Sequence, residues 1–104
     1  MDKEIYLSIE KYKQCLAQQG IEVKKVLLFG SRAKGDHHQY SDLDLVVVSN
    51  DFKNLDLWER LSVLGMARAG LRGIPVEILG VTEEEFERGD AFTQQEIKPV
   101  AVEL

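Results

Sequence analysis

Hydrophobic residues near the start of the chain recur with a helical period. Ile5, Ile9, Tyr12 and Leu16 are spaced at i, i+4, i+7 and i+11, which places them on one face of a helix. Gly20 follows them, and glycine commonly ends a helix. The pattern therefore predicts an amphipathic first helix that packs one side against a core.

Three short segments are rich in β-branched and other apolar residues, which favours β-strands. They cover residues 23–29, 42–49 and 75–79. Gly30 and Ser31 break the first segment, and residues 34–40 predict a polar loop before the second. We expect the three strands to belong to one small sheet.

A long amphipathic helix is predicted between the second and third strands. It covers residues 52–69, with Asn50 or Asp51 as its cap and Trp58 packed beside its apolar face. That face is marked by Leu57, Leu61, Leu64 and Arg68.

The residues after the third strand predict two short helices. Thr82 and Glu85 match a capping box, which indicates a helix through Arg88, and residues 92–97 favour another. The order of elements predicts an α/β (α+β) fold, with a small mixed sheet of at least three strands flanked by helices. A chain of 104 residues fits a single domain, residues 1–104.

The composition of the chain indicates where in the cell it is expected and which classes of partner it favours. No apolar run approaches the roughly 20 residues of a membrane span, and the N-terminus lacks a signal-peptide pattern. The single cysteine, Cys15, forms no internal disulfide, so we expect a cytoplasmic protein with no membrane attachment. The 13 basic and 18 acidic residues give a net charge of −5, which argues against nucleic acid as the main partner. A nucleotide as a small ligand stays compatible with this charge.

Two acidic residues open the second predicted strand. Asp42 and Asp44 are two positions apart, so their carboxylates leave the same face, with Cα atoms about 7 Å apart. Leu43, Leu45 and Val47 point to the opposite face and anchor the strand in a core. Carboxylates at this spacing can converge on a pair of divalent cations. Mg²⁺ matches these oxygen ligands best, with Mn²⁺ as the alternative.

Glu77 is the acidic residue of the third predicted strand. It alternates with Val76 and Ile78, which face the other way. If the third strand lies beside the second, Glu77 stands next to the two aspartates. It then acts as a third metal ligand or as the general base for an attacking hydroxyl, and the sequence leaves both roles open.

The turn after the first strand is suited to binding phosphate. Gly30 and Ser31 stand where a buried strand ends, so backbone N–H groups and a small hydroxyl can approach a phosphate closely. Arg32 and Lys34 follow directly. They either add positive charge beside the phosphates or belong to the solvated surface.

Together these residues resemble the minimal nucleotidyltransferases, a family within the superfamily of DNA polymerase beta and kanamycin nucleotidyltransferase. Gly-Ser at 30–31, ten further residues and Asp-Leu-Asp at 42–44 match the family signature G-S-x10-D-x-D. The preceding apolar strand, Ser41 before the acids, the long helix and the acidic third strand agree in order over residues 23–80.

The resemblance implies a site and a reaction. The Gly-Ser turn and Ser41 would contact a nucleoside triphosphate, and Asp42 and Asp44 would hold two Mg²⁺ ions. Glu77 would take the third carboxylate position, which is often Asp in minimal members and Glu in some relatives. Such proteins are often encoded beside a helical HEPN protein. The implied activity is the transfer of AMP from ATP to a hydroxyl of that partner, and the implied role is that of an antitoxin.

Two alternatives to this function stay open. The chain is either a noncatalytic module that neutralises a partner by forming a complex, or a transferase acting on the hydroxyl of a small molecule. The motifs leave little room for an acceptor-binding domain, so we expect dependence on a second chain. Val46 and Val48 continue the face of the aspartates, and either a helix of this chain or a partner covers them.

Overall fold

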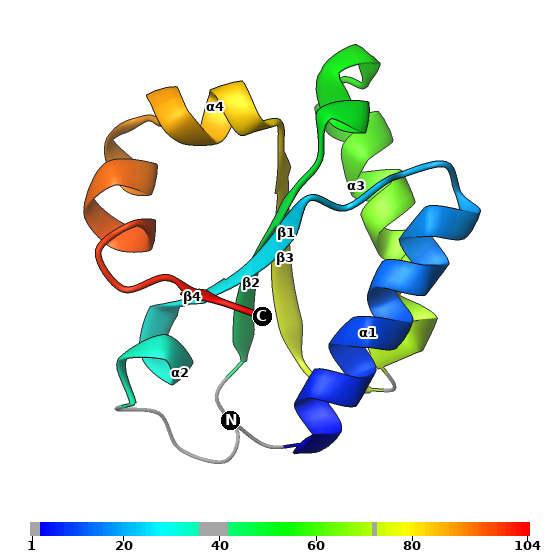
Figure 1. Cartoon of the computed structure of the whole chain (residues 1–104), viewed down its shortest axis with the longest axis horizontal. Coiled ribbons are helices and arrows are strands. Elements are labelled where there is room, and N and C mark those ends of the chain that lie inside the picture. Colours follow the sequence, from blue (N-terminus) through cyan, green and yellow to red (C-terminus); the bar gives the residue numbers. More distant parts are fainter. Residues whose placement is uncertain (1–2, 36–41, 72) are drawn as a thin grey trace.

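The computed structural model describes residues 3–35, 42–71 and 73–104. Figure 1 shows the order of the elements. They are α1 (Lys3–Gln18), β1 (Lys25–Phe29), α2 (Gly30–Lys34), β2 (Leu43–Val48), η1 (Asn50–Asn54), α3 (Leu57–Met66), η2 (Ala67–Leu71), β3 (Val76–Val81), α4 (Glu83–Arg88), η3 (Thr93–Ile97) and β4 (Val102–Glu103). The predicted fold class is confirmed: a small mixed sheet is flanked by helices.

The strands form one sheet in the order β3-β2-β1-β4. β1 runs antiparallel to both β2 and β4, whereas β2 and β3 are parallel. A parallel pair needs a crossover connection, and the segment from η1 to η2 supplies it. The sequence did not indicate β4, whose Val102 and Glu103 pair with Leu28 and Leu27. The third strand therefore lies beside the second, as the interpretation of Glu77 requires.

Helices cover both faces of the sheet. In Figure 1, α1 and α3 lie on one side, and α4 and the C-terminal segment lie on the other. The first face buries alternate residues of β2, namely Leu43, Leu45 and Val47. The second buries Val46 and Val48 against Phe86 and Ile97. The chain itself therefore covers the two valines.

The predicted first helix is confirmed by α1, whose buried residues are Ile5, Ile9, Tyr12 and Leu16. The Tyr12 hydroxyl donates a hydrogen bond to the Leu64 carbonyl at 3.0 Å, and burial raises the pKa of this hydroxyl. Cys15 is partly buried against the same core. Within the described ranges, none of the helices has both the length and the hydrophobicity to cross a membrane.

The predicted helix over residues 52–69 is wrong in its boundaries. The chain forms η1, becomes extended at Leu55 and begins α3 at Leu57. The cap is Asp56, which forms a capping box with Glu59, so the cap predicted at Asn50 or Asp51 is also wrong. This late start turns Trp58 outward, where its side chain is 77% exposed. The expectation that Trp58 packs is therefore wrong as well.

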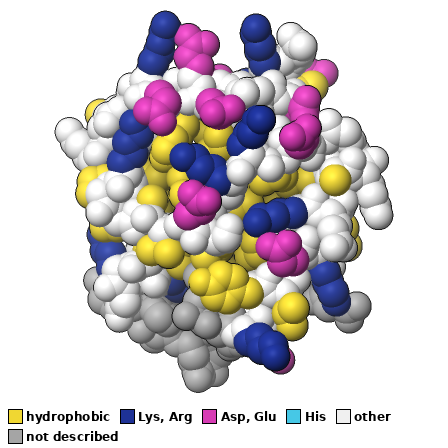
Figure 2. Space-filling model, in the orientation of Figure 1, with side chains coloured by type: hydrophobic (Ala, Val, Ile, Leu, Met, Phe, Trp, Pro, Cys, Tyr) yellow, Lys and Arg dark blue, Asp and Glu magenta, His cyan; other side chains and the backbone are white. Residues whose placement is uncertain are grey.

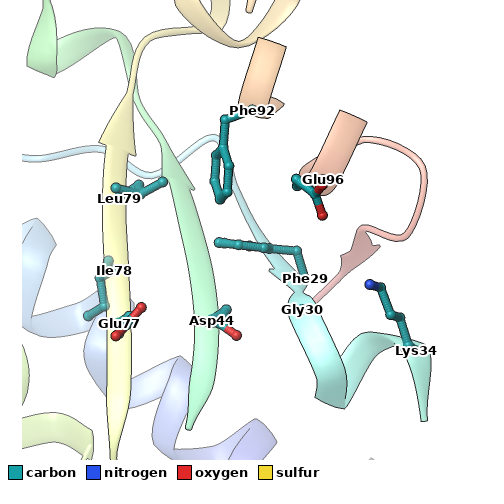
Figure 3. A pocket seen from close by; sticks show the side chains of 9 residues that line it. All are labelled: Phe29, Gly30, Lys34, Asp44, Glu77, Ile78, Leu79, Phe92 and Glu96. Carbon is teal, nitrogen blue, oxygen red and sulfur yellow. The ribbon is translucent and has the colours of Figure 1, made fainter. Parts of the chain in front are cut away.

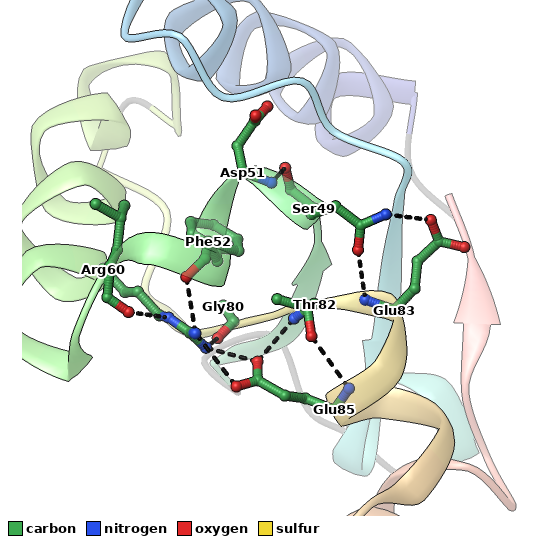
Figure 4. A network of polar contacts seen from close by, with 10 residues as sticks. Ser49, Asp51, Phe52, Arg60, Gly80, Thr82, Glu83 and Glu85 are labelled. Atoms are coloured by element: carbon green, nitrogen blue, oxygen red, sulfur yellow. Dashed lines mark hydrogen bonds and ion pairs between the residues drawn. The ribbon is translucent and has the colours of Figure 1, made fainter.

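Arg60 joins the elements around the crossover (Figure 4). Its guanidinium donates to the backbone carbonyls of Leu55 at 3.0 Å, Phe52 at 2.8 Å and Gly80 at 3.2 Å. It also pairs with Glu85 through Nη1 and Oε1 at 2.7 Å and through Nη2 and Oε2 at 3.2 Å. One mostly buried side chain thus ties η1 and α3 to the end of β3 and to α4.

Replacing Arg60 with alanine leaves these carbonyls without their donor, so we expect a loss of about 2 kcal/mol in the free energy of unfolding. Arg60→Lys, which keeps the charge but lacks the planar fork, should lose less than the alanine variant. Urea denaturation at neutral pH measures both. Equal stability of the wild type and Arg60→Ala would contradict the role of Arg60.

The same pair has a predictable pH dependence. The hydrogen bond from Arg60 lowers the pKa of Glu85 from its ordinary value of 4.5. A lowered folded-state pKa contributes stability that is present above pH 4.5 and is lost as the pH falls through the folded pKa. Denaturation at a series of pH values should therefore show the cost of Glu85→Gln shrinking below pH 4.5. A cost that stays constant down to pH 2 would exclude this linkage.

Candidate active site

Asp44 and Glu77 face each other across the parallel strands. The register pairs Asp44 of β2 with Glu77 of β3, and both side chains lie on the face of the sheet that carries α4 (Figure 3). The other face of β2 is filled by Leu43 and Leu45, which fixes the direction of Asp44. The sheet therefore forces two carboxylates together at the start of this strand pair.

The pKa of Asp44 is raised by this arrangement. Partial burial raises the pKa of Asp44, and the negative charges of Glu77 and then Asp42 raise it further, as does a side-chain hydrogen bond with Glu77. Asp42 lies directly before β2 and is exposed. The sequence-based grouping of Asp42, Asp44 and Glu77 is thus present as one cluster of interacting negative charges.

Gly30 makes room for Asp44. It follows β1 directly, has a φ of +74° and lies beside Asp44, because Phe29 pairs with Asp44 in the antiparallel register. A Cβ built on Gly30 would collide with the Asp44 carboxylate and lie 3.0 Å from its Cγ. Only glycine satisfies both the left-handed backbone and the close approach of the carboxylate.

The segment after Gly30 differs from the prediction. The sequence indicated a turn and then a loop over residues 34–40, but the structure places the five-residue helix α2 over Gly30–Lys34. Ser31 and Arg32 are half-buried on this helix, and Lys34 is exposed. Ser41 and the predicted loop beyond residue 35 lie outside the described residues.

A cavity of about 370 Å³ opens over the carboxylates (Figure 3). Four predicted site residues line it, namely Gly30, Lys34, Asp44 and Glu77, while Ser31, Arg32 and Asp42 do not. The remaining lining residues are Phe29, Ile78, Leu79, Phe92 and Glu96. Sequence reasoning assigned these five no role in the site. The alternation along β3 could have indicated Leu79, two residues after Glu77, but nothing local pointed to Phe92 or Glu96.

The donor set suits a divalent cation that also binds the substrate. Across the described ranges, no group of three or more His, Cys, Asp or Glu side chains is arranged to hold a metal ion. The site contains the Asp44–Glu77 pair with Asp42 nearby, and partial burial together with these negative charges raises the pKa of Asp44. Mg²⁺ is commonly held by one or two carboxylates, with phosphate oxygens and water completing its shell. The residues therefore fit an open metal site shared with a phosphate ligand.

Comparison with known families identifies the class of protein. The family model of the nucleotidyltransferase domain matches residues 9–103, and the chain belongs to this family. A search of curated proteins gave no significant match.

Solved structures share the fold. A candidate nucleotidyltransferase from Sulfolobus solfataricus is 24% identical, with a TM-score of 0.60 over 99% of this chain and 86% of that one. A toxin–antitoxin structure with AMP-PNP is 20% identical, with a TM-score of 0.61. A mutant of the toxin–antitoxin MntA-HpeT is 17% identical, with a TM-score of 0.59. Each of the last two matches covers 90% of this chain and 69% of the other.

Gly30→Ala tests the contact between the turn and Asp44. We expect at least a 10-fold loss of nucleotide transfer, because the new methyl group displaces the Asp44 carboxylate, together with about 1 kcal/mol of destabilisation from the positive φ. Gly35→Ala is the matched control, since Gly35 has a φ of +82° but an added Cβ there would meet none of the described residues within 4 Å. The control should share the destabilisation and retain activity. Equal activities of the two variants would contradict the contact.

Proposed function

We propose that this chain is a metal-dependent nucleotidyltransferase that moves AMP from ATP to a hydroxyl of a HEPN-type partner protein and thereby acts as an antitoxin. The observation that carries the proposal is the Asp44–Glu77 pair, placed beside the bare backbone of Gly30 in one cavity. Membership in the nucleotidyltransferase domain family supports the class of reaction.

In this proposal some residues of the site bind the phosphates and others bind the metal ions. Gly30 lets phosphate oxygens approach the backbone, and the Lys34 ammonium adds positive charge at the same end of the cavity. Asp42 and Asp44 would hold Mg²⁺ together with the phosphates. When bound, the ions neutralise charge on the phosphates and lower the pKa of the attacking hydroxyl.

The transfer itself exchanges one P–O bond for another. The acceptor oxygen forms a bond to the α-phosphorus while the bond to the pyrophosphate oxygen breaks, and pyrophosphate leaves. Glu77 lies beyond Asp44 as seen from Gly30, on the neighbouring strand β3, and this position supports a role in taking the proton of the hydroxyl. We therefore prefer the general-base role for Glu77 over the role of a third metal ligand.

The proposed partner rests on two observations. The chain shares its fold with toxin–antitoxin structures, one of them with AMP-PNP. Its α3 also exposes large apolar side chains, with Leu57 66%, Trp58 77% and Met66 71% exposed, as surfaces that bind other proteins do. The described part of the face in Figure 2 mixes acidic and basic side chains, which favours a protein over the phosphate backbone of a nucleic acid.

Labelled transfer tests the reaction. We expect the chain, incubated with Mg²⁺, α-labelled ATP and the HEPN-type product of a neighbouring gene, to place label on that partner. Asp44→Asn should lower the rate about 100-fold or more, since it removes a metal-binding charge. Glu10→Gln is the control, because Glu10 is exposed on α1 outside the cavity and forms a surface ion pair with Lys13. A stable complex without label would instead support the noncatalytic binding module, and label on a small-molecule hydroxyl alone would support the other alternative.

Glu77→Gln separates the two roles of this residue. As general base, Glu77 acts mainly in the transition state, so we expect kcat to fall about 100-fold while the affinity for ATP with Mg²⁺ changes less than 3-fold. Glu77→Asp, which keeps the charge on a shorter side chain, should recover part of kcat. Equal losses in kcat and ATP affinity would assign Glu77 to the metal.

A further inference from the structure

The cavity continues beyond the carboxylates into an apolar end. Phe92 and Leu79 line this end and are 49% and 43% exposed, so two large apolar side chains present open surface to one cavity. In Figure 3 they face the cavity from opposite sides, Leu79 from β3 and Phe92 from the segment before η3. Neither the metal nor the phosphates explain these two side chains.

Phe92 is held firmly in place. Its ring packs edge-on against Phe29, with centroids 6.1 Å apart and planes at 83°. The Asp90 carboxylate accepts a hydrogen bond from the Thr93 backbone N–H at 2.9 Å, and Ile97 at the end of η3 is buried. The exposed part of Phe92 is therefore a fixed aromatic surface.

The charges around the cavity set the direction of a bound nucleotide. In Figure 3 Gly30 lies at one end of the cavity and Phe92 at the other, and the Lys34 side chain extends from the Gly30 end toward the Glu96 carboxylate, which lies between Lys34 and Phe92. The Lys34 ammonium attracts phosphates, and the Glu96 carboxylate repels them, so the phosphates belong at the Gly30 end. The flat, uncharged part of a nucleoside triphosphate is its base, and this part fits the apolar end.

The exposed ring of Phe92 lies on the side of the cavity formed by Phe29 and Gly30. Phe92 contacts Phe29, the residue immediately before Gly30, whereas Glu77 is on β3 at the far side of β2. Leu79 is also on β3, but its side chain reaches across toward Phe92 (Figure 3). A group stacked on Phe92 therefore shares a side with the phosphates, which favours the base over the acceptor of the transfer.

We propose that Phe92, faced by Leu79, is the platform on which the nucleobase stacks. This inference rests on the proposed function, because it takes a nucleoside triphosphate as the ligand. Stacking of a base on an aromatic side chain strengthens binding by about 5- to 150-fold. Phe92 would then fix the base end of the nucleotide, and the Gly30–Lys34 segment would fix its phosphate end. Held at both ends, the nucleotide would keep its α-phosphate close to Asp44.

Two ligands measured side by side test the platform. Isothermal titration calorimetry in Mg²⁺ gives the Kd of AMP-PNP, which has the base, and of inorganic tripolyphosphate, which lacks it. Phe92→Ala should weaken AMP-PNP binding about 10-fold and leave tripolyphosphate binding unchanged. Phe92→Trp should restore or strengthen AMP-PNP binding, because it supplies a larger aromatic face. Tyr6→Ala, at an exposed aromatic of α1 outside the cavity, is the matched control and should change neither Kd.

A second variant guards against a folding defect. Leu79→Ala leaves the Phe29–Phe92 pair intact and should also weaken AMP-PNP selectively, about 3-fold, with an unchanged melting temperature. An equal loss for both ligands in Phe92→Ala, or no loss for either, overturns the platform. An unchanged AMP-PNP Kd with a raised KM for the acceptor protein overturns it in favour of an acceptor site. Selective loss of AMP-PNP binding in a chain that transfers no label leaves the platform standing and refutes the transferase.

Discussion

The site depends on two like charges that the sheet holds side by side. Asp44 and Glu77 are register partners on parallel strands, and one face of β2 is fully occupied by core residues. Neither carboxylate can turn away without moving a buried strand. The partial burial of Asp44, with the repulsion from Glu77 added to it, raises the pKa of Asp44, and a cation bound between the two carboxylates would relieve this repulsion. The packing of the core thus offsets the electrostatic free energy that is needed to hold the two carboxylates together.

The position of this pair along the strands is as important as the pair itself. Farther along the same face, Val46 and Val48 are sealed under Phe86 and Ile97. The beginning of β2 is open to the cavity. It lies beside the end of β1, where Gly30 has no side chain to fill the space that Asp44 occupies. The covering segment begins at α4, and Arg60 fixes α4 to the crossover through Glu85. A contact on one edge of the molecule therefore helps to define how far the cavity extends.

The polar half of the site could be predicted from the sequence, because its geometry is local. Two-residue alternation places Asp42 and Asp44 on one face, and it also places Glu77 opposite Val76 and Ile78. The apolar half could not be predicted in this way. Phe92 reaches the cavity only because the C-terminal segment returns to β1 through β4, a two-residue strand with no pattern of its own. Likewise, helical spacing identified Leu57 and Leu61 as apolar but did not indicate that the Asp56 cap would leave them exposed.

The two halves of the cavity also come from different parts of the fold. The carboxylates and Gly30 belong to the sheet, where each side chain is constrained by the register and by a buried opposite face. Phe92 and Glu96 belong to a segment held by Ile97 and by the Asp90 cap. On the proposed function, a substitution in that segment would change which ligand the cavity accepts, whereas a substitution at Gly30 would displace the Asp44 carboxylate for every ligand. The proposed reaction chemistry thus depends on the sheet, and the proposed choice of ligand depends on a peripheral segment.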